Sequence, residues 1–394
     1  MSGRFRQMRN NVFAAVVLAS IAYTSALGET AHHNEGAIGY FSPDYQEARK
    51  KFLDAAQTAG ASVESFRNPN AGPEGGSIFT DVALIGPKDA KAILVLGSGT
   101  HGVEGFAGSG IQTGLLKEGI ASSLKPNSAI VIVHAINPYG FAHLRRFNEN
   151  NVDLNRNFVD HAKPYPRNQR YEDLVDAICP KSISRWADLK SRGWFFWYGL
   201  VNGRSKLKEA ITGGQYAFPK CPFYGGHAET WSNKTMRDIS NRYLAQADRV
   251  VIVDFHTGLG PYGHGEVIMN VPKESPAYKR AVRWWGDRVR TTVDGGSVSS
   301  HLYGTVKLAF PRMLPGVEVT AASLEFGTYP GLEVFWAIRA ENWLQHHGDQ
   351  ETPETKKRIK SDLLRAFYPD KEDWKTQVWN QGKEVVEEAL AHLK

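Results

Sequence analysis

Short apolar runs alternate with longer segments of helical periodicity, and this alternation limits the chain to few folds. The runs that predict strands are residues 92–96, 129–135, 250–255, 266–270 and 319–326. The segments that predict helices are residues 45–59, 106–117, 277–289, 332–346, 353–367 and 373–394. Strands separated by helices favour an α/β fold in which helices cover a parallel or mixed sheet.

The length of 394 residues is long for one domain, yet α/β enzymes often form a single unit of this size. We therefore predict one domain over residues 29–394. Between about residues 160 and 245 the pattern loosens, which indicates an insertion. An aromatic cluster at residues 194–198 lies in it, and we expect local core there rather than a binding platform.

Residues 1–28 are typical of an export signal, with three arginines before an apolar stretch at residues 12–27. We expect a secreted or periplasmic protein. The alternatives are a membrane anchor over residues 12–28, which would be the only contact with a membrane, and an organelle presequence.

The net charge of +6 falls to 6 − 3 = +3 without Arg4, Arg6 and Arg9. A small, scattered excess gives no footprint for a polyanion, so no nucleic-acid partner is expected. The two cysteines, Cys179 and Cys221, are compatible with one disulfide or with two buried thiols.

The turn after the first apolar run carries His101 and Glu104, an imidazole and a carboxylate that can share a metal ion. The same turn, residues 97–102, matches the G-x-G-x-x-G pattern of dinucleotide sites. The next run ends in Ile136 and Asn137 rather than in an acidic residue for a ribose, which weakens that alternative. No G-x-S-x-G motif supports a serine hydrolase.

A third ligand and a base are available at the ends of later strands. His256 directly follows the run 250–255, and the carboxyl ends of strands gather active sites in α/β sheets. Three protein ligands that leave one position open are usual for a catalytic zinc. Glu325 lies inside an apolar run, where a carboxylate is costly without a function, so we predict it as the general base.

Candidate substrate-binding groups lie in the asparagine-rich stretch 148–158 and directly before it. Arg145, Arg146 and Arg156 can grip a carboxylate or stabilise an oxyanion, and Asn155 can hydrogen-bond the same carboxylate. Asp153 is a natural partner for the free ring nitrogen of a metal-bound histidine.

Taken in order, these motifs resemble the zinc carboxypeptidases of the carboxypeptidase A type. They are also similar to the murein-peptide amidases and to the succinylglutamate desuccinylase/aspartoacylase enzymes. The stretch Val152-Asp-Leu-Asn-Arg-Asn-Phe158 is the most specific part of the resemblance, which spans residues 101–325. Two features depart from the pattern: the long interval from Arg156 to His256, and a substrate-side tyrosine for which Tyr262, Tyr303 and Tyr329 compete.

The resemblance implies a mixed, mostly parallel eight-stranded sheet between helices. It implies zinc ligation by His101, Glu104 and His256, with Asp153 orienting His101. It further implies carboxylate binding by Asn155 and Arg156, carbonyl polarisation by Arg146 with Arg145 as the fallback, and general acid/base catalysis by Glu325.

The predicted function is hydrolysis of an amide bond next to a free carboxylate by a zinc metallocarboxypeptidase acting on small peptides. One alternative is a deacylase of N-acyl amino acids. The other is a non-catalytic binding protein that keeps the same scaffold.

Overall fold

A computed structural model describes residues 35–300 and 302–393 of the chain. Residues 37–393 form one compact unit. The predicted export signal therefore lies outside the described residues, and the insertion stays a prediction. None of the helices in the described part is long and apolar enough to cross a membrane.

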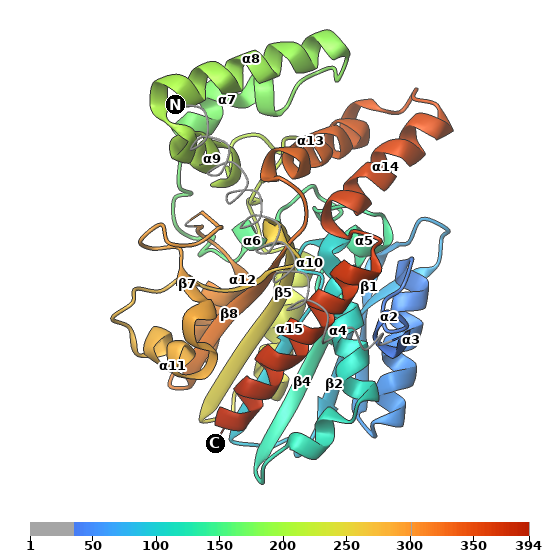
Figure 1. The fold of residues 1–394 in the computed structure, drawn as a ribbon, viewed down its shortest axis with the longest axis vertical. Coiled ribbons are helices and arrows are strands. Elements are labelled where there is room, and N and C mark those ends of the chain that lie inside the picture. The colour runs from blue at the N-terminus through green and yellow to red at the C-terminus, as the bar shows by residue number, and fades with distance from the viewer. Residues whose placement is uncertain (1–34, 301, 394) are drawn as a thin grey trace, which may run out of the picture. The chain divides into compact units, whose positions relative to one another are not determined.

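The unit is built on an eight-stranded sheet with the order β1-β2-β4-β3-β5-β8-β6-β7. Four of its seven strand pairs are parallel and three are antiparallel. The prediction of a mixed, mostly parallel sheet between helices is confirmed (Figure 1). The strands are β1 (Ser62–Ala71), β2 (Ser77–Ile85), β3 (Ala92–Gly97), β4 (Ser128–His134), β5 (Arg249–Tyr262), β6 (Gly265–Met269), β7 (Val289–Thr291) and β8 (Glu318–Gly327).

The central strands β3 and β4 are buried along their whole length, because helices cover both faces of the sheet. The elements are α2 (Glu35–Ile38), α3 (Tyr45–Thr58), η1 (Gly102–Glu104), α4 (Gly105–Lys117), η2 (Ile120–Ser123), α5 (Pro138–Ala142), α6 (Leu154–Asn157), α7 (Gln169–Ile178), α8 (Arg185–Asn202), α9 (Arg204–Thr212), α10 (Trp231–Tyr243), α11 (Pro276–Trp285), η3 (Gly286–Arg288), α12 (Val306–Met313), α13 (Gly331–His347), α14 (Pro353–Phe367) and α15 (Glu372–His392).

Three apolar clusters hold these layers together. One joins a face of the sheet to α3, α4, α11 and α15, and a second joins the other face to α10 and α12. The third lies among α7, α8, α9, α13 and α14, which gather beyond one end of the strands (Figure 1). Close approach explains one of the glycines in α4: a Cβ at Gly114 would lie 2.3 Å from the Trp379 ring of α15.

The segment 160–245 contains helices α7 to α10 rather than irregular chain. The expectation of local core at residues 194–198 is largely wrong. Phe195 is buried, but Trp194, Phe196 and Trp197 are 51%, 74% and 59% exposed, because α8 buries only one of its faces.

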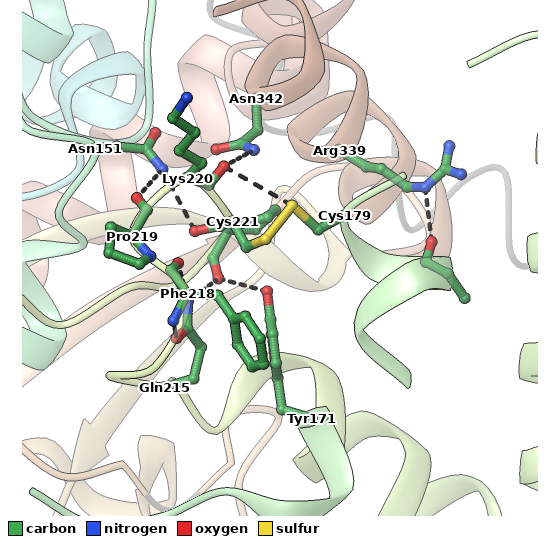
Figure 2. The surroundings of a disulfide bond; sticks show 12 residues. Asn151, Tyr171, Cys179, Gln215, Phe218, Pro219, Lys220, Cys221, Arg339 and Asn342 are labelled. Atoms are coloured by element: carbon green, nitrogen blue, oxygen red, sulfur yellow. Dashed lines mark hydrogen bonds between the residues drawn. A yellow bond between two sulfur atoms is a disulfide. The ribbon is translucent and has the colours of Figure 1, made fainter. Parts of the chain in front are cut away.

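A disulfide joins Cys179, at the end of α7, to Cys221 (Figure 2). Polar side chains hold the chain around Cys221 as well. Asn151 Nδ2 donates to the carbonyls of Pro219 and Cys221, at 3.1 and 3.4 Å, and Asn342 Nδ2 donates to the Lys220 carbonyl at 2.8 Å. These contacts fix the segment that leads to Phe223.

Candidate metal centre

Three adjacent parallel strands bring the predicted ligands and base together. β3 pairs with β5 and β5 pairs with β8, so the ends of these strands share one edge of the sheet. His101 follows β3 in the turn before η1, His256 lies in β5, and Glu325 lies opposite His256 in β8.

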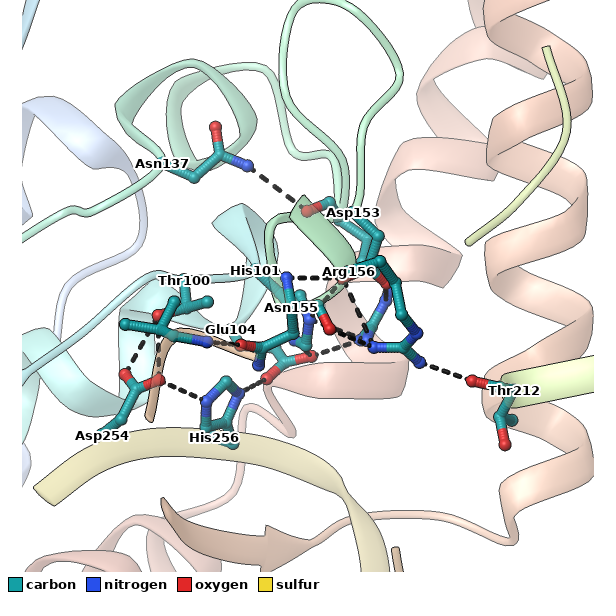
Figure 3. A network of polar contacts seen from close by, with 12 residues as sticks. Thr100, His101, Glu104, Asn137, Asp153, Asn155, Arg156, Thr212, Asp254 and His256 are labelled. Carbon is teal, nitrogen blue, oxygen red and sulfur yellow. Dashed lines mark hydrogen bonds and ion pairs between the residues drawn. The ribbon is translucent and has the colours of Figure 1, made fainter. Parts of the chain in front are cut away.

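Two histidine rings face one carboxylate. His101 Nδ1 lies 2.8 Å from Glu104 Oε1, and His256 Nδ1 lies 2.9 Å from Glu104 Oε2 (Figure 3). The three side chains are buried, and one nitrogen or oxygen from each lies within 4.8 Å of the others. One cation could therefore touch all three residues.

The far nitrogen of each ring lies against a second carboxylate. His101 Nε2 is 3.1 Å from Asp153 Oδ1, and His256 Nε2 is 2.7 Å from Asp254 Oδ2. Thr100 Oγ1 donates to both oxygens of Asp254, at 3.1 and 3.0 Å, and so fixes that carboxylate. At His256, a proton held on Nε2 leaves the Nδ1 lone pair for a metal. At His101, Arg146 Nη2 also lies 2.9 Å from Nε2.

The carboxylates favour positive charge between the rings. Burial opposes a charge on His256, but Asp254 and Glu104 outweigh it and raise the pKa of His256 to about 10. Burial also opposes ionisation of Glu104, yet the two histidines and Arg146 hold its pKa below the usual range. Two imidazoles and a carboxylate form a ligand set that suits zinc.

Glu325 lies on the same cavity without contacting the ring nitrogens. Its Oε1 accepts a hydrogen bond of 3.1 Å from the Leu259 backbone N–H. Burial, and then the negative charge of Glu104, raise the pKa of Glu325 to about 7. A carboxyl group with this pKa can both accept and donate a proton near neutral pH.

Arg146 is held at the site through its backbone. The Gly102 N–H donates to the Arg146 carbonyl at 3.2 Å, and the Val103 N–H donates to the Arg145 carbonyl at 2.8 Å. This approach requires glycine, because a Cβ at Gly102 would lie 2.0 Å from the Gly140 carbonyl carbon. The Arg146 guanidinium thereby reaches Glu104, with Nη1 2.6 Å from Oε1.

Asn155 and Arg156 belong to the short helix α6 and line the same cavity. Asn155 Oδ1 accepts a hydrogen bond of 3.0 Å from the Val306 N–H. Arg156 donates to the carbonyls of Asn155 and Thr212, while its Nε has no partner among the described residues. A buried guanidinium with a free N–H can bind an anion.

The cavity encloses about 820 Å³ of space, part of it open to solvent, and reaches well beyond the metal ligands. One wall is apolar and comes from α13 and α14, through Val334, Phe335, Ile338 and Phe367. The far end is polar and contains Asn270, Lys307 and Ser323.

Comparison with known proteins assigns the family. Residues 41–381 match the profile of a family described as "Protein of unknown function (DUF2817)". The chain belongs to this family. A search of curated proteins gave no match.

Solved structures of similar fold include members of two groups. The carboxypeptidase A of Helicoverpa armigera is 13% identical over 84% of this chain and 75% of that chain, with a TM-score of 0.44. A putative carboxypeptidase from Burkholderia mallei is 14% identical over 83% and 68%, with a TM-score of 0.42. The succinylglutamate desuccinylase of Chromobacterium violaceum is 15% identical over 84% and 76%, with a TM-score of 0.36. The predicted resemblance to both groups is confirmed, and it concerns the fold alone.

Arg145 does not line the cavity, so the structure does not support it as a substitute for Arg146 in contacting the substrate. Its side chain is buried, where Nε donates to Glu341 Oε1 at 2.8 Å and Nη2 donates to Asn151 Oδ1 at 2.8 Å. The turn at residues 145–146 sends two successive side chains in different directions. Among the described residues, no tyrosine lines the cavity either, so Tyr262, Tyr303 and Tyr329 all lie outside it.

Sequence reasoning missed Asp254, Thr100 and Lys307. A signal for Asp254 was available, because residues two apart in a strand share a face and Asp254 stands two before His256. Lys307 also had a signal, as the one charge in the apolar stretch Val306–Phe310. Thr100 had none, because its role depends on the contact between two strands.

Proposed function

We propose that this protein is a zinc-dependent hydrolase that cleaves an amide bond next to a free carboxylate, most simply as a metallocarboxypeptidase. The observation that carries the proposal is one cavity holding a buried His–Glu–His group, a separate buried carboxyl group at Glu325, and the Arg146 and Arg156 guanidinium groups. Amide hydrolysis by the mechanism below uses each of these groups.

A zinc ion held by His101, Glu104 and His256 would polarise the substrate carbonyl and acidify a water molecule. Glu325 accepts the proton of the attacking water and returns it to the departing nitrogen. Arg146 stabilises the negative charge that develops on the carbonyl oxygen. Asn155 and Arg156 hold the free carboxylate, and the unpartnered Nε of Arg156 supports that role.

N-acyl amino acids are the second candidate substrates. The apolar wall formed by Val334, Phe335, Ile338 and Phe367 offers an acyl chain a place beside the reacting carbonyl. A deacylase would use the same residues in the same roles. The partners we propose are therefore small substrates that carry a free carboxylate.

We also propose that the protein works in an oxidising compartment, secreted or periplasmic, or anchored to a membrane through residues 12–28. The Cys179–Cys221 disulfide supports this location, because disulfides persist mainly outside reducing compartments.

The test measures zinc content and hydrolysis on the full chain. Wild type should hold about one zinc per chain and cleave blocked dipeptides, N-acyl amino acids or both, whereas His101→Ala should lose the metal and the activity. His264→Ala removes an exposed histidine and serves as the matched control. Wild-type protein that binds no zinc, even when zinc is added, would make the chain a binding protein on the same scaffold.

A further inference from the structure

A buried lysine lies at the far end of the cavity. Lys307, in the first turn of α12, has 9% of its surface exposed. Its Nζ donates to the Ile268 carbonyl at 3.0 Å and to Ser323 Oγ at 2.9 Å. An ammonium group has three N–H donors, so one remains after these two bonds.

Lys307 has no carboxylate partner. Among the described residues, no carboxylate oxygen lies within 4.0 Å of the Lys307 Nζ, the limit for an ion pair. The negative charges of Asp254, Glu325 and Glu266 act on it from farther away. Burial lowers the pKa of Lys307 to about 8, which still leaves the ammonium as the main form at neutral pH. A buried charge without a counter-ion is costly unless a ligand supplies one.

Asn270 adds a second unsatisfied group at the same end of the cavity. Its side chain is 8% exposed, and neither Oδ1 nor Nδ2 has a hydrogen-bond partner among the described residues. Buried amides are nearly always paired, because an unpaired one costs about 1–3 kcal/mol. The Lys307 ammonium and the Asn270 amide together offer free donors.

This end of the cavity lies beside the reaction site. Ser323 stands two residues before Glu325 in β8, so both side chains face the same side of the sheet. β6 pairs with β8 and carries Ile268, and Asn270 follows β6 directly. A substrate held at Glu325 can therefore extend a side chain toward Lys307.

We propose that Lys307 and Asn270 bind a side-chain carboxylate, so that the substrate residue with the free α-carboxylate is glutamate or aspartate. The inference rests on the proposed function for the position of that residue. A carboxylate satisfies both the charge of Lys307 and the donors of Asn270. A neutral amide side chain can pair with Asn270, but it leaves the charge of Lys307 without a counter-ion.

Binding of two matched probes tests this inference. N-acetyl-L-glutamate and N-acetyl-L-glutamine differ by one charged group, and calorimetry with the zinc-loaded full chain compares them. Wild type should bind the glutamate probe about 10-fold more tightly, and Lys307→Met should remove that difference. Equal binding of the two probes by wild type, or an undiminished preference in Lys307→Met, would overturn the inference.

Two further variants protect the conclusion. Lys279→Met removes an exposed lysine and should keep the preference. Asn270→Leu removes the unpaired amide without adding charge, and it should weaken the preference several-fold even if Lys307→Met does not fold. Because binding needs no turnover, a preserved preference without hydrolysis contradicts only the proposed function. Hydrolysis without preference contradicts only the role of Lys307.

A different observation concerns the exposed face of α8. Phe195 packs this helix against Phe335 of α13, with ring centroids 5.5 Å apart. The large apolar side chains that α8 exposes are Trp186, Leu189, Trp194, Phe196, Trp197, Leu200 and Val201. Surface apolar side chains are usually scattered singly, so this cluster needs an occupant.

The charges near this face favour a lipid surface. Arg185, Lys190, Arg204 and Lys206 are exposed on α8 and α9, while the acidic residues of these two helices pair with other arginines: Asp188 with Arg339 at 2.6 Å and Glu209 with Arg170 at 2.8 Å. Tryptophan, phenylalanine and leucine with flanking cations are typical of helices that lie in a membrane interface. We infer that the exposed face of α8 binds an anionic membrane surface.

Tryptophan fluorescence tests this second inference, because the first tryptophan of the chain is Trp186 and residues 1–34 contribute none. Vesicles of phosphatidylcholine and phosphatidylglycerol with brominated acyl chains should quench the full-length wild type. They should quench far less a variant that carries Trp186→Gln, Trp194→Gln and Trp197→Gln. Equal fractional quenching in both proteins would contradict a membrane contact. A wild-type dimer that the three substitutions dissociate would make a second copy the occupant.

Discussion

Arg145 and Arg146 are neighbours in the chain but belong to two different buried regions. Arg145 lies in a sealed region, where Glu341 accepts from both Arg145 and Lys360. Arg146 faces the cavity, where Glu104 also lies against the two histidines. In the sealed region the cations already have their carboxylate, whereas the cavity groups are arranged around a space that a ligand can fill.

His134 and His256 show the same contrast. Both are buried, in β4 and β5, on either side of β3. Burial lowers the pKa of His134 to about 4, and the charges of Asp81 and Arg49 act on it in opposite directions. The pKa of His256 is raised to about 10, because Asp254 and Glu104 outweigh burial. Burial alone therefore does not mark a functional histidine, and the neighbouring carboxylates do.

The largest expected effect is on kcat, and it distinguishes a carboxylate of the cavity from a carboxylate of the sealed region. Glu325→Gln should keep the zinc but lower kcat by roughly 10²- to 10⁴-fold, because the amide cannot accept the proton of water. Zinc content and steady-state kinetics measure both. Glu341→Gln changes a carboxylate of the sealed region and should leave kcat of the folded protein unchanged. A fully active Glu325→Gln protein would end the proposed mechanism.

The two adjacent arginines should differ in what their loss affects. Arg145→Met should lower the free energy of unfolding by roughly 3 kcal/mol, near the low end for a broken buried pair, because Lys360 still pairs with Glu341. Urea titration measures this change. Arg146→Met should affect kcat far more than stability. The contrast between the regions fails if the two variants lose equal stability and equal activity.

The buried histidine of β4, His134, should make stability depend on pH. The folded-state pKa of His134 is about 4 and the unfolded value is about 6.5, so the unfolded state binds more protons between these values. Stability should therefore fall by about 3 kcal/mol as the pH drops from 6.5 to 4. His134→Phe keeps the ring that stacks on Phe52 and should lack this part of the pH dependence. Thermal unfolding of both proteins across this range makes the comparison, and identical pH profiles would contradict the expectation.

The smallest effect concerns the carboxylate behind His256. Asp254→Asn should weaken zinc affinity by roughly 10- to 100-fold, because the ring loses the charge that orients it and strengthens its lone pair. Competition with a chromogenic chelator measures the affinity. Thr100→Val should act in the same direction but more weakly, since it only holds Asp254 in place. An unchanged affinity in Asp254→Asn would show that His256 does not need this partner.

Apolar periodicity predicted most of the fold, because the central elements are buried on every side. The run predicted at 92–96 is β3 (Ala92–Gly97), and the helix predicted at 353–367 is α14 (Pro353–Phe367). The runs predicted at 129–135, 250–255, 266–270 and 319–326 correspond to β4, β5, β6 and β8. The helix predicted at 277–289 ends earlier, at Trp285, because Gly286 adopts a positive φ of 57°.

Peripheral strands left no comparable pattern. β1 (Ser62–Ala71) lies at the edge of the sheet, is mostly exposed and contains Pro69. β7 (Val289–Thr291) is too short for a periodic signal. Hydrophobic patterning reports burial, so these exposed or short strands give little signal. β2 (Ser77–Ile85) was missed as well although most of it is buried, so burial accounts for only part of what the sequence left out.

The sequence by itself determined the chemistry that this protein can attempt. The residue types and order of His101, Glu104, His256 and Glu325 predict a ligand set and a base, because strand ends in an α/β sheet converge. Only the tertiary structure decided which neighbour each group meets. It placed Asp254 behind His256, turned Arg145 away from Arg146, and brought Lys307 to the end of the cavity. Such contacts join residues far apart in the chain, and no local pattern encodes them.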